Sequence, residues 1–206
     1  MSRRALVPPE QTHDNILDVA ERLFREVGYG KTTVADIAQA LGMSSANVYR
    51  FFASKADIHN AIFTRTVAGL HAALRDAAGA PGSAADRLAG VIHTSHRLHR
   101  DLFTDQRRVF DMVEAAMAEN WEAIEAHVAA VQAIIAGVIA DGIAAGEFGP
   151  GDPDGLAAAV LDGSCAFMHP TMIAECADKP DREAHLARLL WLVIEGLRNH
   201  DRTPMP

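Results

Sequence analysis

The fold is decided by residues 16–62, which read ILDVAERLFREVGYGKTTVADIAQALGMSSANVYRFFASKADIHNAI. Apolar residues recur there every three or four positions, which is the period of a helix with one buried face. A first helix is expected over about 14–27, and its buried stripe comprises Ile16, Ala20, Leu23, Phe24 and Val27. Gly28 should end this helix, because glycine readily takes the left-handed conformation that closes many helices.

Two short helices are expected next within the same stretch. Thr33 is placed to cap the first of them, with Asp36 as its reciprocal partner three residues on. Gly42 breaks the chain after two turns, and Ser44 or Ser45 can cap the second helix. Two short helices joined by a glycine-containing turn have the organisation of a helix-turn-helix. Such a motif presents its second helix to the major groove of DNA, which is about 12 Å wide.

A compact three-helix bundle without DNA-binding activity is the alternative interpretation, since short helices joined by glycine are common. In such a bundle Tyr49, Phe51 and Phe52 would be core aromatics, and Phe52 is expected to be buried in either case.

The stretch closely resembles the DNA-binding domain of the TetR family over roughly residues 14–63. The features that carry the resemblance occur in order and without interruption, and they are Ala20 to Phe24, residues 28–34, Ile37-Ala38, Gly42-Met43-Ser44, Val48 to Phe52 and Ser54-Lys55. The resemblance implies a DNA-lining set made of Thr33, Ser44, Ser45, Ala46, Asn47, Tyr49, Arg50 and Lys55.

The chemistry of these side chains agrees with that role. Asn47 and Arg50 suit base reading, because an amide can bond adenine and a guanidinium guanine through two hydrogen bonds. Thr33, Tyr49 and Lys55 suit contacts to phosphate.

The sequence departs from the family pattern at two positions. Ala46 stands where a glycine is frequent, and Phe51 stands where a more polar residue is frequent. Phe51 would contact a thymine methyl group or pack locally, so the operator sequence is left open. The two serines before Ala46 suit either phosphate or base contacts, and Arg3 and Arg4 would reach an adjacent minor groove or be disordered.

The rest of the chain predicts an all-α fold of about nine helices. Ser54 with Asp57 should open a long helix that reaches about Ala78, and Ser83 with Asp86 should open the next one. Further helices are expected near residues 84–100, 103–118, 121–146, 154–177 and 181–199. Pro170 should kink or split the helix over 154–177, since proline cannot continue a helix undistorted.

Three regions are expected from this pattern: a flexible arm over 1–11, a helix-turn-helix domain over 12–60, and a ligand-binding and dimerisation domain over 61–206. The net charge of −8 lies entirely outside residues 1–60, whose charges balance. An acidic surface repels phosphates, so any DNA contact must come from the first quarter of the chain.

Several classes of protein are disfavoured by the sequence. No uninterrupted apolar run reaches the roughly 18 residues that predict a membrane span, and the N-terminus has no apolar signal region, so a cytoplasmic protein is expected. No nucleophile elbow, phosphate-binding glycine loop or dinucleotide fingerprint is present, so no enzyme and no cofactor are expected. Gly163-Ser164-Cys165 is the nearest nucleophile-like stretch, and it falls inside a predicted core helix.

By resemblance, the helices over about 84–146 should enclose a pocket for a small-molecule effector, and the last two should form a four-helix interface with a second subunit. Aromatic and thioether side chains suit an apolar or aromatic effector. The candidate ligand-binding residues are Phe103, Phe110, Met117, Trp121, Phe167, Met168, His169 and Met172. His169 is the polar candidate, since the helix break at Pro170 frees backbone groups that a ligand could satisfy.

The predicted function is that of a ligand-responsive repressor that binds a palindromic DNA operator as a homodimer. A metal- or redox-responsive regulator of the same fold is the alternative. His93, His96 and His99 recur every three residues and neighbouring pairs could bind an ion, although a plain polar helix face fits them better and no metal is expected. Cys165 and Cys176 would lie about 16 Å apart on one helix, too far for a disulfide within it.

Overall fold

The computed structural model describes residues 8–104, 121–176 and 179–199. These residues form nine α-helices and one short 3-10 helix, with no strand among them. The predicted all-α fold is therefore confirmed. The chain divides into an N-terminal unit, whose described part is residues 8–66 and 121–123, and a C-terminal unit formed by the remaining described residues.

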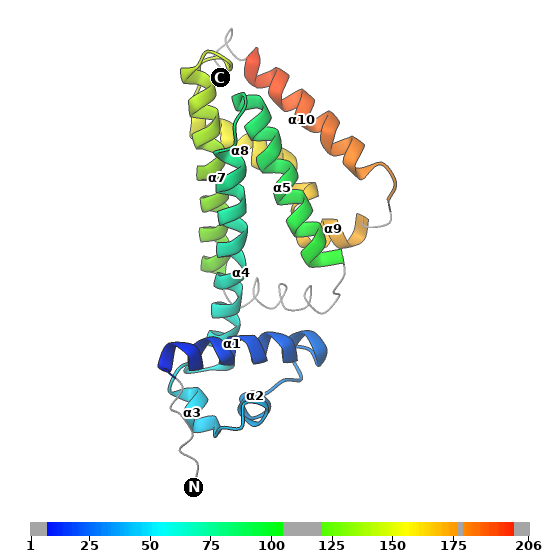
Figure 1. The fold of residues 1–206 in the computed structure, drawn as a ribbon. Coiled ribbons are helices and arrows are strands. Elements are labelled where there is room, and N and C mark those ends of the chain that lie inside the picture. The colour runs from blue at the N-terminus through cyan, green and yellow to red at the C-terminus, as the bar shows by residue number, and fades with distance from the viewer. Residues whose placement is uncertain (1–7, 105–120, 177–178, 200–206) are drawn as a thin grey trace. The chain divides into compact units, whose positions relative to one another are not determined.

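The N-terminal unit contains α1 (Pro9–Glu26), α2 (Val34–Ala40), α3 (Ser45–Tyr49) and the first half of α4 (Lys55–Ala78), as Figure 1 shows. One apolar core joins the four helices. Its buried members are Ile16, Leu17, Ala20, Phe24, Val34, Ile37, Ala38, Val48, Phe52, Ile58 and Ile62.

Helix α1 begins at Pro9, five residues before the predicted start. Pro8 is extended and Pro9 takes the first helical position, where the missing N–H of proline costs nothing. The helix ends at Glu26, and Gly28 adopts a φ of +103°, so the predicted stop is confirmed.

The C-terminal unit contains the rest of α4 and six further helical segments. They are α5 (Ala84–Thr104), α7 (Trp121–Ala144), α8 (Pro153–Ser164), the 3-10 helix η1 (Cys165–Phe167), α9 (Pro170–Cys176) and α10 (Arg182–Arg198). The core is centred on fully buried side chains of α4, α5, α7 and α10, namely Leu74, Leu88, Val91, Ile92, Ile135, Ile139 and Leu186. The predicted helix over 103–118 lies almost entirely outside the described residues.

Most of α7, residues 123–144, is long and apolar enough to cross a membrane by length and composition alone. The sequence had indicated no such segment, because charged residues and glycine interrupt its apolar run. Ile135 and Ile139 of this helix are fully buried in the core of the C-terminal unit. One such helix is weak evidence for a membrane span, because the core helix of a soluble protein passes the same test.

The predicted helix over 154–177 is divided into α8, η1 and α9 before Pro170. Side chains from two other helices hold this break. His96 of α5 donates from Nδ1 to the carbonyl oxygen of Phe167 at 2.7 Å. Arg182 of α10 donates to the carbonyl oxygen of Ala166, and its guanidinium carbon lies 4.5 Å from the centre of the Phe167 ring. The break is thus a fixed part of the fold.

Candidate nucleic-acid interface

The turn between α2 and α3 is built as the sequence predicts. Gly42 has a φ of +64°, which disfavours side chains, and the N–H of Met43 donates to the carbonyl oxygen of Ala38 at 2.9 Å. Ser44, the first of the two candidate caps, accepts a hydrogen bond from the N–H of Asn47. Val48 is fully buried and anchors α3 against the core. Its burial fixes which side of α3 faces solvent.

The solvent side of α3 carries most of the predicted DNA-lining residues. Ser44, Ala46, Tyr49 and Arg50 are exposed, and Ser45 and Asn47 are half-buried. Tyr49 is 52% exposed, so it is no core aromatic.

The other two aromatics of this segment face inward. Phe52 is buried, as predicted, and its ring stacks on His13 with the centroids 4.8 Å apart. Phe51 is half-buried and packs against the core of the N-terminal unit, which favours the local-packing interpretation of this residue.

Asn47 and Arg50, the predicted base readers, lie side by side. Arg50 donates from Nη1 to Oδ1 of Asn47 at 3.5 Å, and Nδ2 of Asn47 lies 3.5 Å from the sulfur of Met43. The first contact is at the long limit of hydrogen bonding and the second has a thioether as its acceptor, so both are weak. Asn47 and Arg50 can therefore give up these contacts and form hydrogen bonds to the edges of DNA bases at little energetic cost.

Thr33 forms the predicted capping box with Asp36. Its Oγ1 accepts from the N–H of Asp36 at 3.2 Å and donates to the carboxylate at 2.7 Å, and its own N–H donates to the same carboxylate at 2.8 Å. The hydrogen bond from the Thr33 hydroxyl, and then the one from its backbone N–H, hold the pKa of Asp36 below its usual value. The hydroxyl hydrogen of Thr33 is thus already used within the cap.

Lys55 occupies a different environment from the other predicted DNA contacts. Its Nζ donates to the carbonyl oxygens of Tyr29 at 2.9 Å and Thr32 at 3.2 Å, and it lies 4.1 Å from the centre of the Tyr29 ring. These contacts fasten the first turn of α4 to the α1–α2 connection. Sequence patterns could not reveal them, because the partners lie more than twenty residues away along the chain.

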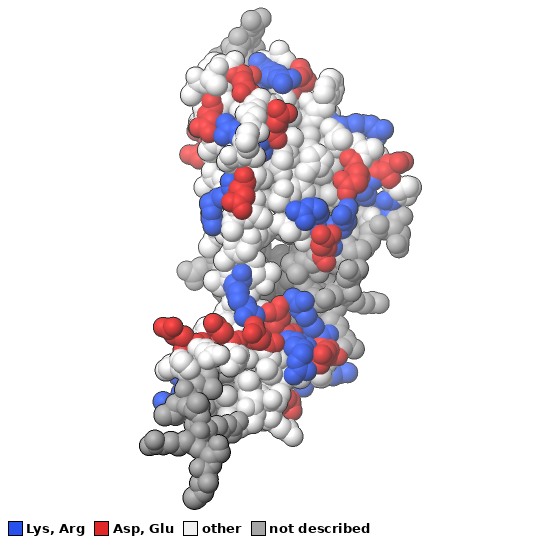
Figure 2. Space-filling view, viewed as in Figure 1, with Lys and Arg blue, Asp and Glu red and all other residues white. Residues whose placement is uncertain are grey.

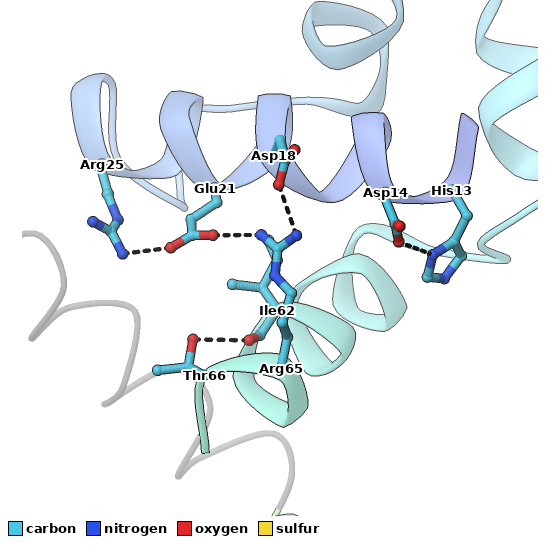
Figure 3. A network of polar contacts seen from close by, with 8 residues as sticks. All are labelled: His13, Asp14, Asp18, Glu21, Arg25, Ile62, Arg65 and Thr66. Carbon is cyan, nitrogen blue, oxygen red and sulfur yellow. Dashed lines mark hydrogen bonds and ion pairs between the residues drawn. The ribbon is translucent and has the colours of Figure 1, made fainter. Parts of the chain in front are cut away.

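An ion-pair cluster joins α4 to α1 within the N-terminal unit (Figure 3). Arg65 donates to Oδ1 of Asp18 at 2.7 Å and to Oε2 of Glu21 at 2.6 Å, and Arg25 bonds the same glutamate. The guanidinium presents its donors as a fork, so it can bond two carboxylates at once.

Charge is unevenly distributed over the N-terminal unit. In Figure 2 carboxylates form a row along one edge of the N-terminal unit, and Figure 3 labels Asp14, Asp18 and Glu21 on α1. A row of acidic groups repels phosphate, whereas the solvent side of α3 carries Arg50 and no acidic side chain. The surface of α3 is therefore the one suited to DNA.

Two family models match the chain. The model described as "Bacterial regulatory proteins, tetR family" matches residues 16–62, and the model described as "Tetracyclin repressor-like, C-terminal domain" matches residues 84–190, about half of the chain. The chain belongs to the TetR family of transcriptional regulators. The helix-turn-helix of this TetR-family regulator lies within the residues that the first model matches.

Curated relatives match part of the chain. The chain is 35% identical over 63 residues to the HTH-type transcriptional regulator AcrR of Shigella flexneri, covering 31% of this chain and 29% of the relative. It is 32% identical over 80 residues to the HTH-type transcriptional repressor KstR2 of Mycobacterium tuberculosis, covering 39% of this chain and 40% of the relative. The matched segments span less than half of the length of these relatives.

Solved structures match nearly the whole TetR-family chain. A putative transcriptional regulator from Pseudomonas aeruginosa PAO1 superposes with a TM-score of 0.72 at 16% identity, covering 95% of this chain and 94% of the other. A TetR/AcrR-family regulator from Thermobifida fusca gives a TM-score of 0.66 at 22% identity, covering 91% and 99%. At these identities the likeness concerns the fold.

The predicted effector-binding residues of the regulator are only partly described. Phe110 and Met117 lie outside the described residues, as do the side chains of Phe103 and Trp121. The remaining candidates lie around the break between α8 and α9, where Phe167 and Met168 are buried, His169 is half-buried and Met172 is 38% exposed.

Two buried polar atoms at this break have no hydrogen-bond partner among the described residues. They are Nδ1 of His169 and Oγ of Ser164, a residue with no exposed surface. Ser164 was not predicted as a site residue, since a serine inside an apolar helix gives no sequence signal. An unsatisfied buried polar atom costs about 1–3 kcal/mol, which a bound polar group can recover.

The residues of the metal and redox alternatives are dispersed. His93 is exposed, His96 is buried against η1, and His99 donates from Nδ1 to the carbonyl oxygen of Ser95, so they do not converge. Within the described ranges no three His, Cys, Asp or Glu side chains are arranged to hold a metal ion. The cysteines lie in different segments, Cys165 exposed in η1 and Cys176 buried in α9, and both are free thiols.

Proposed function

We propose that this regulator is a repressor that binds a palindromic operator as a homodimer and is released by a small, largely apolar or aromatic effector. The observation that carries the proposal is the exposed polar side of α3, whose orientation is set by the burial of Val48 in the core. On that side Asn47 and Arg50 offer the two side-chain types that best discriminate adenine and guanine.

The dimer is supported by the outer surface of α10. Trp191 is 63% exposed and Leu192 is 60% exposed, although both are large apolar side chains. Helix α8 contacts α10 and carries the exposed small residues Ala159 and Gly163, which allow close helix approach. A twofold dimer through these helices would cover the exposed apolar surface.

A palindromic operator follows from such a dimer. Two copies of α3 related by a twofold axis would read half-sites about 34 Å apart, one turn of the duplex. An effector held in the C-terminal unit would release the operator by favouring an arrangement with a different spacing, which needs a coupling of about 1–3 kcal/mol. A cytoplasmic location accompanies this function.

The effector is proposed to bind near the break between α8 and α9. Phe167 and Met168 supply buried apolar surface there, and the unpartnered atoms of Ser164 and His169 supply polarity. This combination of apolar lining and few polar groups is typical of small-molecule sites.

The test is a gel-shift titration with the DNA upstream of the regulator's own gene, at two salt concentrations. We expect specific, salt-sensitive binding that Arg50→Ala weakens by about 1–3 kcal/mol. Arg22→Ala is the matched control, because Arg22 is an exposed α1 arginine that pairs with Glu26 of its own helix. Equal losses in the two variants, or no specific binding to this DNA, would overturn the proposal.

A further inference from the structure

Helix α10 has two sides of opposite character. Leu186, Leu190 and Leu197 are buried and belong to the core of the C-terminal unit. Trp191 and Leu192 are mostly exposed, and in Figure 1 the helix lies at one edge of this unit. The exposed side of α10 is therefore a surface that a partner can reach.

Two opposite charges accompany the apolar pair on the exposed side. Arg188 lies three residues before Trp191, and Glu195 lies three residues after Leu192. Seven residues make about two helical turns, so Arg188 and Glu195 leave the helix on the same side, about 10 Å apart along its axis. The exposed side thus reads basic, apolar, apolar, acidic, and its midpoint falls between Trp191 and Leu192.

Both charged side chains have bonding capacity left within the subunit. Arg188 is exposed and has no hydrogen-bond or ion-pair partner among the described residues. Glu195 bonds Nη1 of Arg198 through Oε1 at 2.7 Å, and its Oε2 has no partner among the same residues. A guanidinium and a carboxylate oxygen are therefore available to a partner.

A twofold axis through the midpoint makes this surface complementary to itself. The two copies of α10 then run antiparallel, and residues equally far from the axis on opposite sides lie level with each other. Arg188 of each copy comes level with Glu195 of the other. Ala187 comes level with Gly196 in the same way, and these small residues allow the two helices to approach closely.

Other pairings of the same surface lack this match. A parallel pair would place the two copies of Arg188 opposite each other and the two copies of Glu195 likewise, so like charges would repel. Sliding an antiparallel pair by one turn would separate each arginine from its glutamate by about 5 Å. The antiparallel arrangement also sets the helix dipoles in opposition, which is favourable.

We infer that α10 pairs antiparallel with α10 of a second copy of this chain about an axis between Trp191 and Leu192, and that two reciprocal Arg188–Glu195 ion pairs select this register and this partner. The inference rests on the proposed homodimer and names the residues that choose its partner. The central apolar side chains supply affinity, and the flanking charges supply specificity. A chain with a reversed charge at either position is rejected by repulsion.

The test is charge reversal, followed by sedimentation equilibrium of the full-length protein over a dilution series. Arg188→Glu brings acid opposite acid at both ends of the interface, and Glu195→Arg brings base opposite base. Each variant should raise the dimer dissociation constant about 30-fold or more at low salt, because two attractions become two repulsions. Arg75→Glu is the matched control at an exposed arginine of α4, and it should leave the constant unchanged.

Two combinations should restore the pairing. The double variant Arg188→Glu/Glu195→Arg exchanges the charges within each chain, so it should recover most of the lost affinity. The two single variants, co-expressed with different affinity tags, should form a heterodimer, because one chain then carries two acids and the other two bases. Circular dichroism of each variant checks that its helices are intact.

Unchanged dissociation constants in both single variants would overturn the inference, as would a failure of both combinations to restore association. The wild-type protein and Trp191→Glu separate this result from a failure of the proposed function. A wild-type monomer at the concentrations that bind the operator refutes the homodimer and the register together. A dimer that Trp191→Glu dissociates and that neither charge reversal weakens keeps the homodimer and refutes the register alone.

Discussion

Gly142 of α7 is a position where a single methyl group should destabilise the C-terminal unit. A Cβ placed there would lie 2.2 Å from Cδ2 and 2.5 Å from Cε2 of Phe148, and 2.9 Å from the Cβ of Ala84. Phe148 is buried, so its ring has no solvent side to move into. The loop that carries Phe148 also brings Glu147 to the first turn of α5, where its carboxylate accepts from the N–H groups of Ala84 and Ala85.

The size of the effect follows from two opposing contributions. Overpacking a core costs about 1–3 kcal/mol, and this contact lies at the upper end because ring and backbone must both shift. Replacing a helical glycine by alanine raises the free energy of unfolding by about 1 kcal/mol, because alanine has the higher helix propensity. For Gly142→Ala we therefore expect a net loss of about 2 kcal/mol. In a protein of this size that lowers Tm by about 4–8 °C.

Gly137→Ala is the matched control. Gly137 is exposed on the same helix and a Cβ there meets no atom within 4 Å, so this variant should gain stability. Thermal unfolding is followed by circular dichroism at one protein concentration, because the stability of a dimer depends on it. If Gly142→Ala is as stable as Gly137→Ala, or if adding Phe148→Leu to Gly142→Ala restores nothing, the packing argument is refuted.

Three further predictions concern assembly, the N-terminal unit and pH. Trp191→Glu should give a monomer in light scattering while His185→Glu, at an exposed position of the same helix, leaves the dimer intact; a dimeric Trp191→Glu would refute the proposed interface. Arg65→Lys should lower the free energy of unfolding by up to about 1 kcal/mol at low salt and less at high salt, since an ammonium cannot fork between two carboxylates; a loss that does not depend on salt would contradict this. In the folded protein the pKa of His127 is lowered from 6.5 to about 4, so between these pH values the unfolded chain binds more protons than the folded one. The stability that is present above pH 6.5 is therefore lost as the pH falls towards 4. His127→Gln should flatten that fall in Tm, and an unchanged slope would exclude His127 as its origin.

Local features of the fold could be predicted from the sequence. The capping partners Thr33 and Asp36, like Ser83 and Asp86, are three residues apart, and both boxes form as expected. The turn at Gly42 requires only the conformation of one residue. Such features depend on neighbours along the chain, which a sequence shows directly.

Contacts between distant segments could not be predicted. The bonds of Lys55 to the α1–α2 connection, of Arg65 to α1, and of His71 to His127 join residues 23 to 56 positions apart. Each depends on how helices pack in three dimensions. Sequence alone therefore indicated Lys55 as a phosphate contact, whereas its three-dimensional surroundings also give it a structural role.

The exposure of Trp191 has a practical consequence. Tryptophan emission moves to shorter wavelength when the indole leaves water. A second subunit that packs on α10 would therefore shift the emission maximum of Trp191 to shorter wavelength. The chain has two tryptophans, and Trp121→Phe leaves Trp191 as the sole emitter. Dilution of that variant would then report subunit association optically, without any attached dye.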